Sequence, residues 1–325
     1  MSNLFWGIYA NHLKDFIASK RQLGFNYKTE ENTLKIFDRF TIDRGESVIG
    51  ITKQLSDDWY RLNPNISQGY RNQRCITLNQ FSSYLCDIGI RSYIRNHPKC
   101  IHSFTPYIFS TRQVKALFAG CDALRTTRRD TNTVVMILPV LVRLLYGTGL
   151  RISEALALKD SDVNIEDNYL VVHDCKNGKE RMIPISRSVS LACGEYMEHR
   201  NRLPLGLVKD ENFFVSLCGN SCKSRSIYKW FNRALRIAGI VKTDHGPRLH
   251  DLRHTFSVHS LAMMAERGSD LYCSLPILSG YLGHECLEST NQYVRLTSEM
   301  YPGLLKEVDM VCLNVFPNLE AHETN

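Results

Sequence analysis

The stretch that decides the fold reads GTGLRISEAL and covers residues 147–156. Its glycines let the chain turn closely, and Arg151 then stands at the start of a predicted helix, where backbone N–H groups also favour anions. The apolar segment 134–146 runs directly into it. Alone, an arginine at a helix start is usually a surface residue. The stretch therefore indicates a function only together with three further segments that follow it in the chain.

The second segment is a predicted β-hairpin. Residues 169–172 and 181–185 have the composition of strands, and they flank the sequence KNGK, in which Asn-Gly is a strong turn signal. Lys176 and Lys179 stand on the two sides of this turn. A turn lysine is usually solvated, but lysine can give up a proton whereas arginine effectively cannot. The hairpin therefore suits a general acid.

The third and fourth segments add histidine, arginine and tyrosine. Residues 249–259 read LHDLRHTFSVH, and His250 and Arg253 in it share one face of a predicted helix. Residues 281–284 read YLGH, and Tyr293 follows nine residues later within the string STNQYV. Because the chain has 15 tyrosines, a single one is more often a packing residue than a reactive group.

In this order, the four segments closely resemble the active-site boxes of the tyrosine recombinase (phage integrase) family. The resemblance covers about residues 106–300, and the helical region before it looks like the core-binding domain of that family. Glu154 corresponds to a supporting acidic position, where it is expected to orient the neighbouring arginine rather than react. The catalytic set that the resemblance implies is Arg151, Lys176, His250, Arg253, His284 and Tyr293.

The resemblance also implies a mechanism. Tyr293 would attack a DNA phosphate and conserve the bond energy as a 3′-phosphotyrosine, so that rejoining needs no ATP. The two arginines would hold the non-bridging phosphate oxygens through charge-assisted hydrogen bonds, with His284 as a further donor. Lys176 would protonate the leaving 5′ oxygen. His250 would help to remove the tyrosine proton, which a phenol does not readily lose at neutral pH.

The function implied is site-specific recombination of double-stranded DNA, for integration, excision or transposition of a mobile element, with chromosome-dimer resolution as an open alternative. Members of the family act as tetramers on two DNA sites, and each subunit passes a C-terminal segment to its neighbour. A helix here would suit such docking, although packing on its own domain is an equal alternative. The apolar residues of that helix are Leu305, Val308, Cys312 and Val315.

Two other functions stay open at this point. A type IB topoisomerase-like enzyme that only relaxes supercoils would use the same active site. A catalytically silent DNA-binding accessory protein would be expected to lose catalytic residues, and here all six are present.

The patterning predicts a mainly α-helical (α+β) chain of two domains that clamp duplex DNA. Residues 1–105 form an all-α core-binding domain with its linker, and residues 106–325 form a mostly helical catalytic domain with a small antiparallel sheet and a C-terminal docking helix. The segment 266–278 looks longer than in compact family members. Candidate DNA-binding residues lie on the polar side of a helix capped by Ser67, in the linker and beside the hairpin turn, with solvated surface as the alternative: Arg71, Arg74, Lys99 and Lys179.

Composition excludes several other classes. The net charge of 40 − 33 = +7 suits a polyanionic partner without requiring one. No N-terminal segment resembles a signal peptide, and the apolar run 134–142 is far short of the roughly 20 residues that span a bilayer, so a cytoplasmic protein without a membrane partner is expected. The 11 cysteines indicate reduced thiols, and Cys218 and Cys222 lack a second pair at zinc spacing. Neither a Walker loop nor a two-metal carboxylate cluster is present, so no metal and no cofactor are expected.

Overall fold

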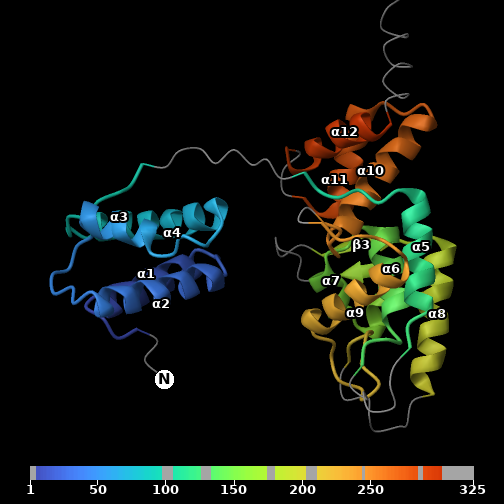
Figure 1. The fold of residues 1–325 in the computed structure, drawn as a ribbon, viewed down its shortest axis with the longest axis horizontal. Coiled ribbons are helices and arrows are strands. Elements are labelled where there is room, and N and C mark those ends of the chain that lie inside the picture. The colour runs from blue at the N-terminus through green and yellow to red at the C-terminus, as the bar shows by residue number, and fades with distance from the viewer. Residues whose placement is uncertain are drawn as a thin grey trace, which may run out of the picture. The chain divides into compact units, whose positions relative to one another are not determined.

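The fold divides into two compact units, Met1–Phe104 and Thr105–Asn325. The computed structural model describes residues 5–96, 105–125, 133–173, 180–202, 211–243, 246–284 and 288–301. The boundary predicted from the sequence falls at residue 105. Both units are mainly helical, and unit 2 contains a small antiparallel sheet (Figure 1), which confirms the predicted fold class.

Unit 1 is built around a core of aromatic side chains. Phe37 packs edge-on against Trp59 with ring centroids 5.3 Å apart, and Phe16 packs against Phe81 at 5.5 Å. The predicted cap is confirmed, because the Ser67 hydroxyl accepts a hydrogen bond from the Tyr70 backbone N–H. The described helices of this unit are α1 (Ala10–Gln22), α2 (Lys28–Asp43), α3 (Lys53–Arg61) and α4 (Gln68–Asp87).

The polar stripe predicted on α4 is wrong at one position. Arg74 is only 5% exposed, and its guanidinium carbon lies 3.8 Å from the centre of the Trp59 ring. Arg74 shares its helix face with the core residues Leu78 and Phe81, so its apolar stem is buried. Its guanidinium forms a cation–π contact with the indole ring. Arg71 is half-buried, and it donates hydrogen bonds to the carbonyl oxygens of Asn63 and Pro64. Neither arginine therefore forms the open cationic stripe expected from the sequence.

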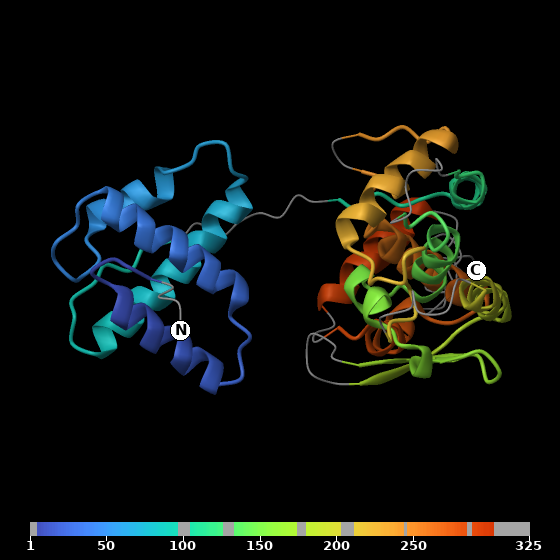
Figure 2. The same ribbon diagram turned by 90° about the horizontal axis from the view of Figure 1, so that it is seen from below.

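Unit 2 places its helices beside a three-stranded sheet. The strands run in the order β1-β2-β3 and are all antiparallel, with Leu170 opposite both Val163 and Ile183. Figure 2 shows the sheet along one edge of this unit, with the helices to one side of it. The strands are β1 (Val163–Asn164), β2 (Tyr169–Val172) and β3 (Arg181–Pro184). The helices are α5 (Thr111–Asp122), α6 (Leu138–Thr148), α7 (Ile152–Ala157), a 3-10 turn η1 (Asp160–Asp162), α8 (Arg187–Asn201), α9 (Ser224–Ile237), α10 (Asp251–Glu266), α11 (Leu271–Leu282) and α12 (Glu288–Met300).

The apolar helix α6 is the centre of unit 2. It contacts α5, α8 and α10, and its buried leucines, among them Leu141, Leu144 and Leu145, belong to the main apolar core of the unit. A second apolar cluster joins α10, α11 and α12 through side chains such as Leu261, Leu278 and Tyr293. The helix that carries the candidate nucleophile is therefore fixed to the helix that carries the His-x-x-Arg segment.

Several other sequence expectations can be placed in unit 2. Both hairpin strands form where predicted. His173, the residue after β2, forms hydrogen bonds with Glu180 and Asp162. The segment 266–278 contains the end of α10, a turn and the first part of α11. The hairpin turn 174–179, with Lys176 and Lys179, and the expected docking helix at 305–315 lie outside the described residues, as does Lys99. Among the described helices, none combines the length and apolar character needed to cross a membrane.

Candidate active site

A tight turn places the first arginine of the site. Gly149 has a left-handed backbone (φ 62°) that ends α6, and Arg151 is the N-cap residue of α7, as the sequence predicts. A Cβ atom at Gly149 would lie 2.5 Å from the Phe256 ring and 2.8 Å from Leu282. Glycine is therefore required both by backbone conformation and by the close approach of α10 and α11.

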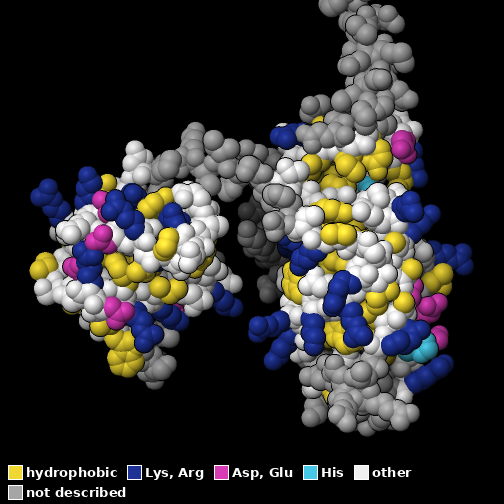
Figure 3. All heavy atoms as spheres, viewed as in Figure 1, with side chains coloured by type: hydrophobic (Ala, Val, Ile, Leu, Met, Phe, Trp, Pro, Cys, Tyr) yellow, Lys and Arg dark blue, Asp and Glu magenta, His cyan; other side chains and the backbone are white. Residues whose placement is uncertain are grey.

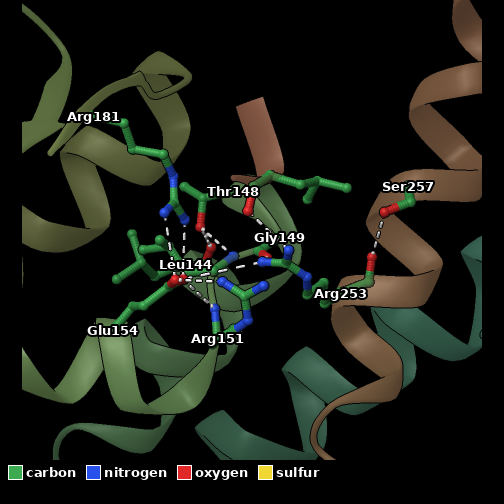
Figure 4. Close-up of polar contacts among 10 residues, drawn as sticks. Leu144, Thr148, Gly149, Arg151, Glu154, Arg181, Arg253 and Ser257 are labelled. Carbon is green, nitrogen blue, oxygen red and sulfur yellow. Dashed lines mark hydrogen bonds and ion pairs between the residues drawn. The ribbon is translucent and has the colours of Figure 1, made fainter. Parts of the chain in front are cut away.

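The carboxylate of Glu154 gathers arginines from three elements (Figure 4). It accepts hydrogen bonds from the Arg151 backbone N–H at 2.8 Å, from the Arg151 guanidinium at 2.7 Å and from Arg181 of β3 at 3.0 Å. The Arg253 guanidinium of α10 lies 4.0 Å away. Burial alone would raise the pKa of Glu154, but the bonds from Arg181 and Arg151 outweigh burial and lower it. The carboxylate is therefore ionised and orients Arg151, as expected.

Arg253 is held at the point where two glycine-linked turns meet. Its side chain is 2% exposed, and it donates hydrogen bonds to the carbonyl oxygens of Gly149 at 2.7 Å and Leu282 at 2.8 Å. Burial, followed by the charge of Arg151, lowers the pKa of Arg253 to about 10, so it stays cationic at neutral pH. A guanidinium has five N–H donors, so this anchoring leaves donors for a bound phosphate.

His284 follows α11 directly and is anchored to α12. Its Nδ1 atom lies 2.7 Å from the Thr290 hydroxyl, so Nε2 is the ring nitrogen left to face a phosphate oxygen. Gly283, with φ 66°, ends α11 immediately before His284. Burial, together with the charges of Arg253 and Arg151, lowers the pKa of His284 to about 4, so the ring is neutral at pH 7.

Tyr293 lies at the same site, on α12. The residue is 2% exposed, and its ring is nearly parallel to that of His284, with centroids 6.3 Å apart. Burial raises the pKa of Tyr293, although Arg253 and Arg151 oppose the rise, so the phenol keeps its proton at neutral pH.

The histidine beside the tyrosine hydroxyl is not the one expected. Nδ1 of His254 lies 3.0 Å from the Tyr293 hydroxyl oxygen, whereas His250 contacts the His254 ring edge-on, with centroids 4.9 Å apart. His250 is the exposed N-cap residue of α10, and partial burial of its ring together with the charges of Arg253 and Arg151 lowers its pKa. His250 therefore lies next to the histidine that contacts the hydroxyl, and its expected help in removing the tyrosine proton stays a prediction.

The structure thus brings together five of the six predicted catalytic residues, and the sixth, Lys176, lies outside the described part of the chain. Sequence reasoning missed two contributors, Arg181 and His254. Arg181 starts the strand that follows the lysine hairpin, and its guanidinium also lies against Gly283, where a Cβ atom would be only 2.7 Å away. His254 is next to Arg253, so its position in the motif was the available signal.

An exposed cationic face on α9 was also missed. Residues 223–237 contain five cations and no carboxylate. Four of these cations recur at spacings of four, four and three residues, which places them on one face of the helix. They are Arg225, Lys229, Arg233 and Arg236, all exposed and none in an ion pair with a described residue. Figure 3 shows Lys and Arg side chains gathered over the region of α9.

No metal centre is found in the described part of the chain. No group of three or more His, Cys, Asp or Glu side chains there is placed to hold an ion. Cys218 and Cys222 do not form a disulfide with each other.

Comparison with known proteins identifies the family. A cluster of arginines beside a buried tyrosine and histidine, on a mainly helical domain, defines a class of protein suited to phosphodiester chemistry. The sequence model of the phage integrase family matches residues 109–300, which is more than half of the chain. The protein belongs to the phage integrase family, and the resemblance found in the sequence is confirmed.

Relatives extend the similarity to most of the chain. The y4rB protein of Sinorhizobium fredii, which is named as a candidate integrase/recombinase, is 27% identical over 91% of this chain and 96% of its own length. Tyrosine recombinase XerC of Staphylococcus aureus is 26% identical over 89% of this chain and 93% of its own. The solved structure of the Tn1549 transposon integrase has a TM-score of 0.65 at 17% identity, covering 87% of this chain and 94% of that one, which shows a shared fold.

Replacing Glu154 by glutamine tests its role as the anchor of the arginines. The change leaves buried guanidinium groups without their counter-charge, so we expect a loss of about 3 kcal/mol in the free energy of unfolding, measured by urea denaturation at pH 7. Because the folded-state pKa of Glu154 is lowered, its contribution is complete above the unfolded value of 4.5 and is lost as pH falls through the folded pKa. The wild-type advantage over Glu154→Gln should therefore shrink below pH 4.5.

Glu198→Gln is the matched control, since Glu198 is exposed on α8. We expect it to change the free energy of unfolding by less than about 0.5 kcal/mol. Equal stabilities of the two variants at pH 7 would show that Glu154 is not the anchor.

Proposed function

We propose that this protein is a site-specific DNA recombinase that cleaves and rejoins strands through a 3′-phosphotyrosine on Tyr293. The observation that carries the proposal is the burial of the Tyr293 hydroxyl in the same site as Arg151, Arg253 and His284. The full-length similarity to integrases and recombinases supports it further.

The chemistry follows from the charges of the site. A phosphodiester that enters beside Arg151 and Arg253 brings one negative charge, and further charge builds on its non-bridging oxygens as the Tyr293 oxygen attacks. Fixed guanidinium donors stabilise that charge without reorganisation, and neutral His284 can donate from Nε2. The new bond joins phosphorus to the tyrosine oxygen, and the bond from phosphorus to the 5′ oxygen breaks.

Proton transfer completes each step. The Tyr293 phenol loses its proton as its oxygen attacks, and His250 takes that proton up. Lys176 gives the leaving 5′ oxygen its proton, since an ammonium can act as an acid where a guanidinium cannot. Rejoining reverses the step, with a 5′ hydroxyl of another strand attacking the phosphotyrosine. Because bond energy is kept in the covalent intermediate, the protein's own groups suffice for exchange without ATP.

Strand exchange between two duplexes sets the stoichiometry. Two double-stranded sites present four strands to be cut, and each chain carries one Tyr293. We infer a tetramer on two DNA sites. Integration, excision or transposition of a mobile element is the role that fits this reaction. Relaxation alone is not favoured, because the relatives that match along most of the chain are integrases and recombinases. A silent accessory protein would not need to keep the arginines, histidines and tyrosine that the site retains.

A nicked suicide duplex tests the proposed reaction. Duplexes drawn from DNA flanking the gene lose a short fragment after cleavage, so the covalent complex accumulates and is seen on a denaturing gel. We expect an adduct with the wild type and none with Tyr293→Phe, which lacks the attacking oxygen. An adduct of equal yield in the phenylalanine variant would place the nucleophile elsewhere.

The cationic face of α9 is proposed to bind the DNA backbone. We expect Lys229→Gln to lower the slope of log affinity against log salt concentration by about 0.9, as for one lost phosphate contact, measured by fluorescence anisotropy. Arg202→Gln, an exposed cation at the end of α8, serves as the control and should leave the slope unchanged. A wild-type slope for Lys229→Gln would remove α9 from the interface.

A further inference from the structure

The Tyr293 hydroxyl has a specific buried partner. Nδ1 of His254 lies 3.0 Å from the hydroxyl oxygen, and the two residues are 8% and 2% exposed. A buried hydroxyl must find a hydrogen-bond partner because water cannot reach it. The contact joins α10 to α12, which the chain connects only through α11 and its flanking turns. This hydrogen bond therefore links the arginine-bearing helix to the nucleophile.

The protonation states make this a bond between two neutral groups. Burial, followed by the charges of His250, Arg253 and His284, lowers the pKa of His254 to about 3. The neutral ring has one bare nitrogen and one N–H, so it can accept from or donate to a phenol. Because the ring binds a proton so weakly, it cannot hold the tyrosine proton as a stable cation. His254 is consequently suited to fixing the hydroxyl and unsuited to storing its proton.

The hydroxyl is held beside the group that would bind the phosphate. Arg253 acts on Tyr293 both through its charge and as a hydrogen-bond donor, and Ser257 also reaches the hydroxyl. Ser257 is itself fixed, since it donates to the Arg253 carbonyl at 2.9 Å (Figure 4). A phosphate bound by Arg253 would therefore lie next to the oxygen that attacks it, so the held position is a productive one.

We propose that His254 is a positioning residue that holds the Tyr293 hydroxyl for attack through Nδ1. The proposal rests on the proposed function, because it assigns a role within that reaction. His254 acts through the tyrosine and needs no contact with DNA. It differs in this respect from His250, which the family resemblance assigns to the reaction itself.

Asparagine and leucine at position 254 separate the hydrogen bond from the packing. Both side chains branch at the γ carbon and both replace the ring, but only asparagine places a polar atom at the δ position that Nδ1 occupies. We expect His254→Leu to form the adduct with the suicide duplex about 10- to 100-fold more slowly than the wild type. His254→Asn should be at least tenfold faster than His254→Leu, while both bind DNA equally in a mobility-shift assay.

The outcomes distinguish this proposal from the proposed function. If the wild type forms an adduct and the asparagine and leucine variants are equally slow, ring volume matters and the hydrogen bond does not, which overturns the proposal. A leucine variant as fast as the wild type overturns it as well. If the wild type forms no adduct on the flanking DNA, the proposed function fails instead.

A second measurement needs no change at His254. In protein with ¹⁵N-labelled histidine rings, we expect the Nδ1 resonance of His254 to move when Tyr293→Phe removes the hydroxyl. The resonances of His12, far away in sequence on α1, should stay in place as the internal control. An unmoved His254 resonance would show that the bond is absent in solution and would overturn the proposal even if His254 variants fail to fold.

Discussion

The site depends on the ionised carboxylate of Glu154. Guanidinium groups repel one another, and three of them meet here: Arg151, Arg181 and Arg253. One carboxylate against three cations leaves a charge of +3 − 1 = +2, so the cluster is held together while it keeps an excess of positive charge. A DNA phosphate supplies the missing anion. The same arrangement therefore explains both how the arginines tolerate burial and why they would attract a phosphodiester.

Two backbone turns position the side chains of this charge cluster. Left-handed glycines at 149 and 283 end α6 and α11 where side chains leave no room for a Cβ atom. The carbonyls of Gly149 and Leu282 then accept from Arg253, so the turn that presents Arg151 also fixes the second arginine. Side-chain bonds to the following helix complete the site, since Thr290 holds His284 and His254 holds the nucleophile. The arginines, histidines and tyrosine of the site are thus positioned by one framework of helices rather than by separate loops.

Much of the fold and of the candidate site could be predicted because it depends on local sequence. The cap at Ser67, the two hairpin strands and the start of α7 at Arg151 depend on a few neighbouring residues, and each formed as expected. Motif order also named Arg151, Arg253, His284 and Tyr293, which the fold brings together, although their roles in catalysis remain predictions.

The remainder depends on packing that a single helix pattern does not contain. His250 and His254 are four residues apart and therefore share one face of the helix, so which of them meets the tyrosine is decided by where along α10 the helix α12 packs. Arg74 has a polar head and a long apolar stem, and only the position of Trp59 determines that it is buried. Arg181 gains its role because β3 lies beside α7 and Gly283, residues far away in sequence. The basic face of α9 was visible in composition and spacing, and could have been predicted.

The most direct test of the account is to find which atom carries the DNA. Wild-type protein trapped on a nicked suicide duplex can be digested with nuclease and trypsin, and the peptide that retains a nucleotide can be sequenced by mass spectrometry. Trypsin should release residues 268–295, which contain Tyr272, Tyr281 and Tyr293. The account predicts that fragmentation places the phosphonucleotide on Tyr293 alone. A nucleotide on either of the other tyrosines, or on a different peptide, would contradict it.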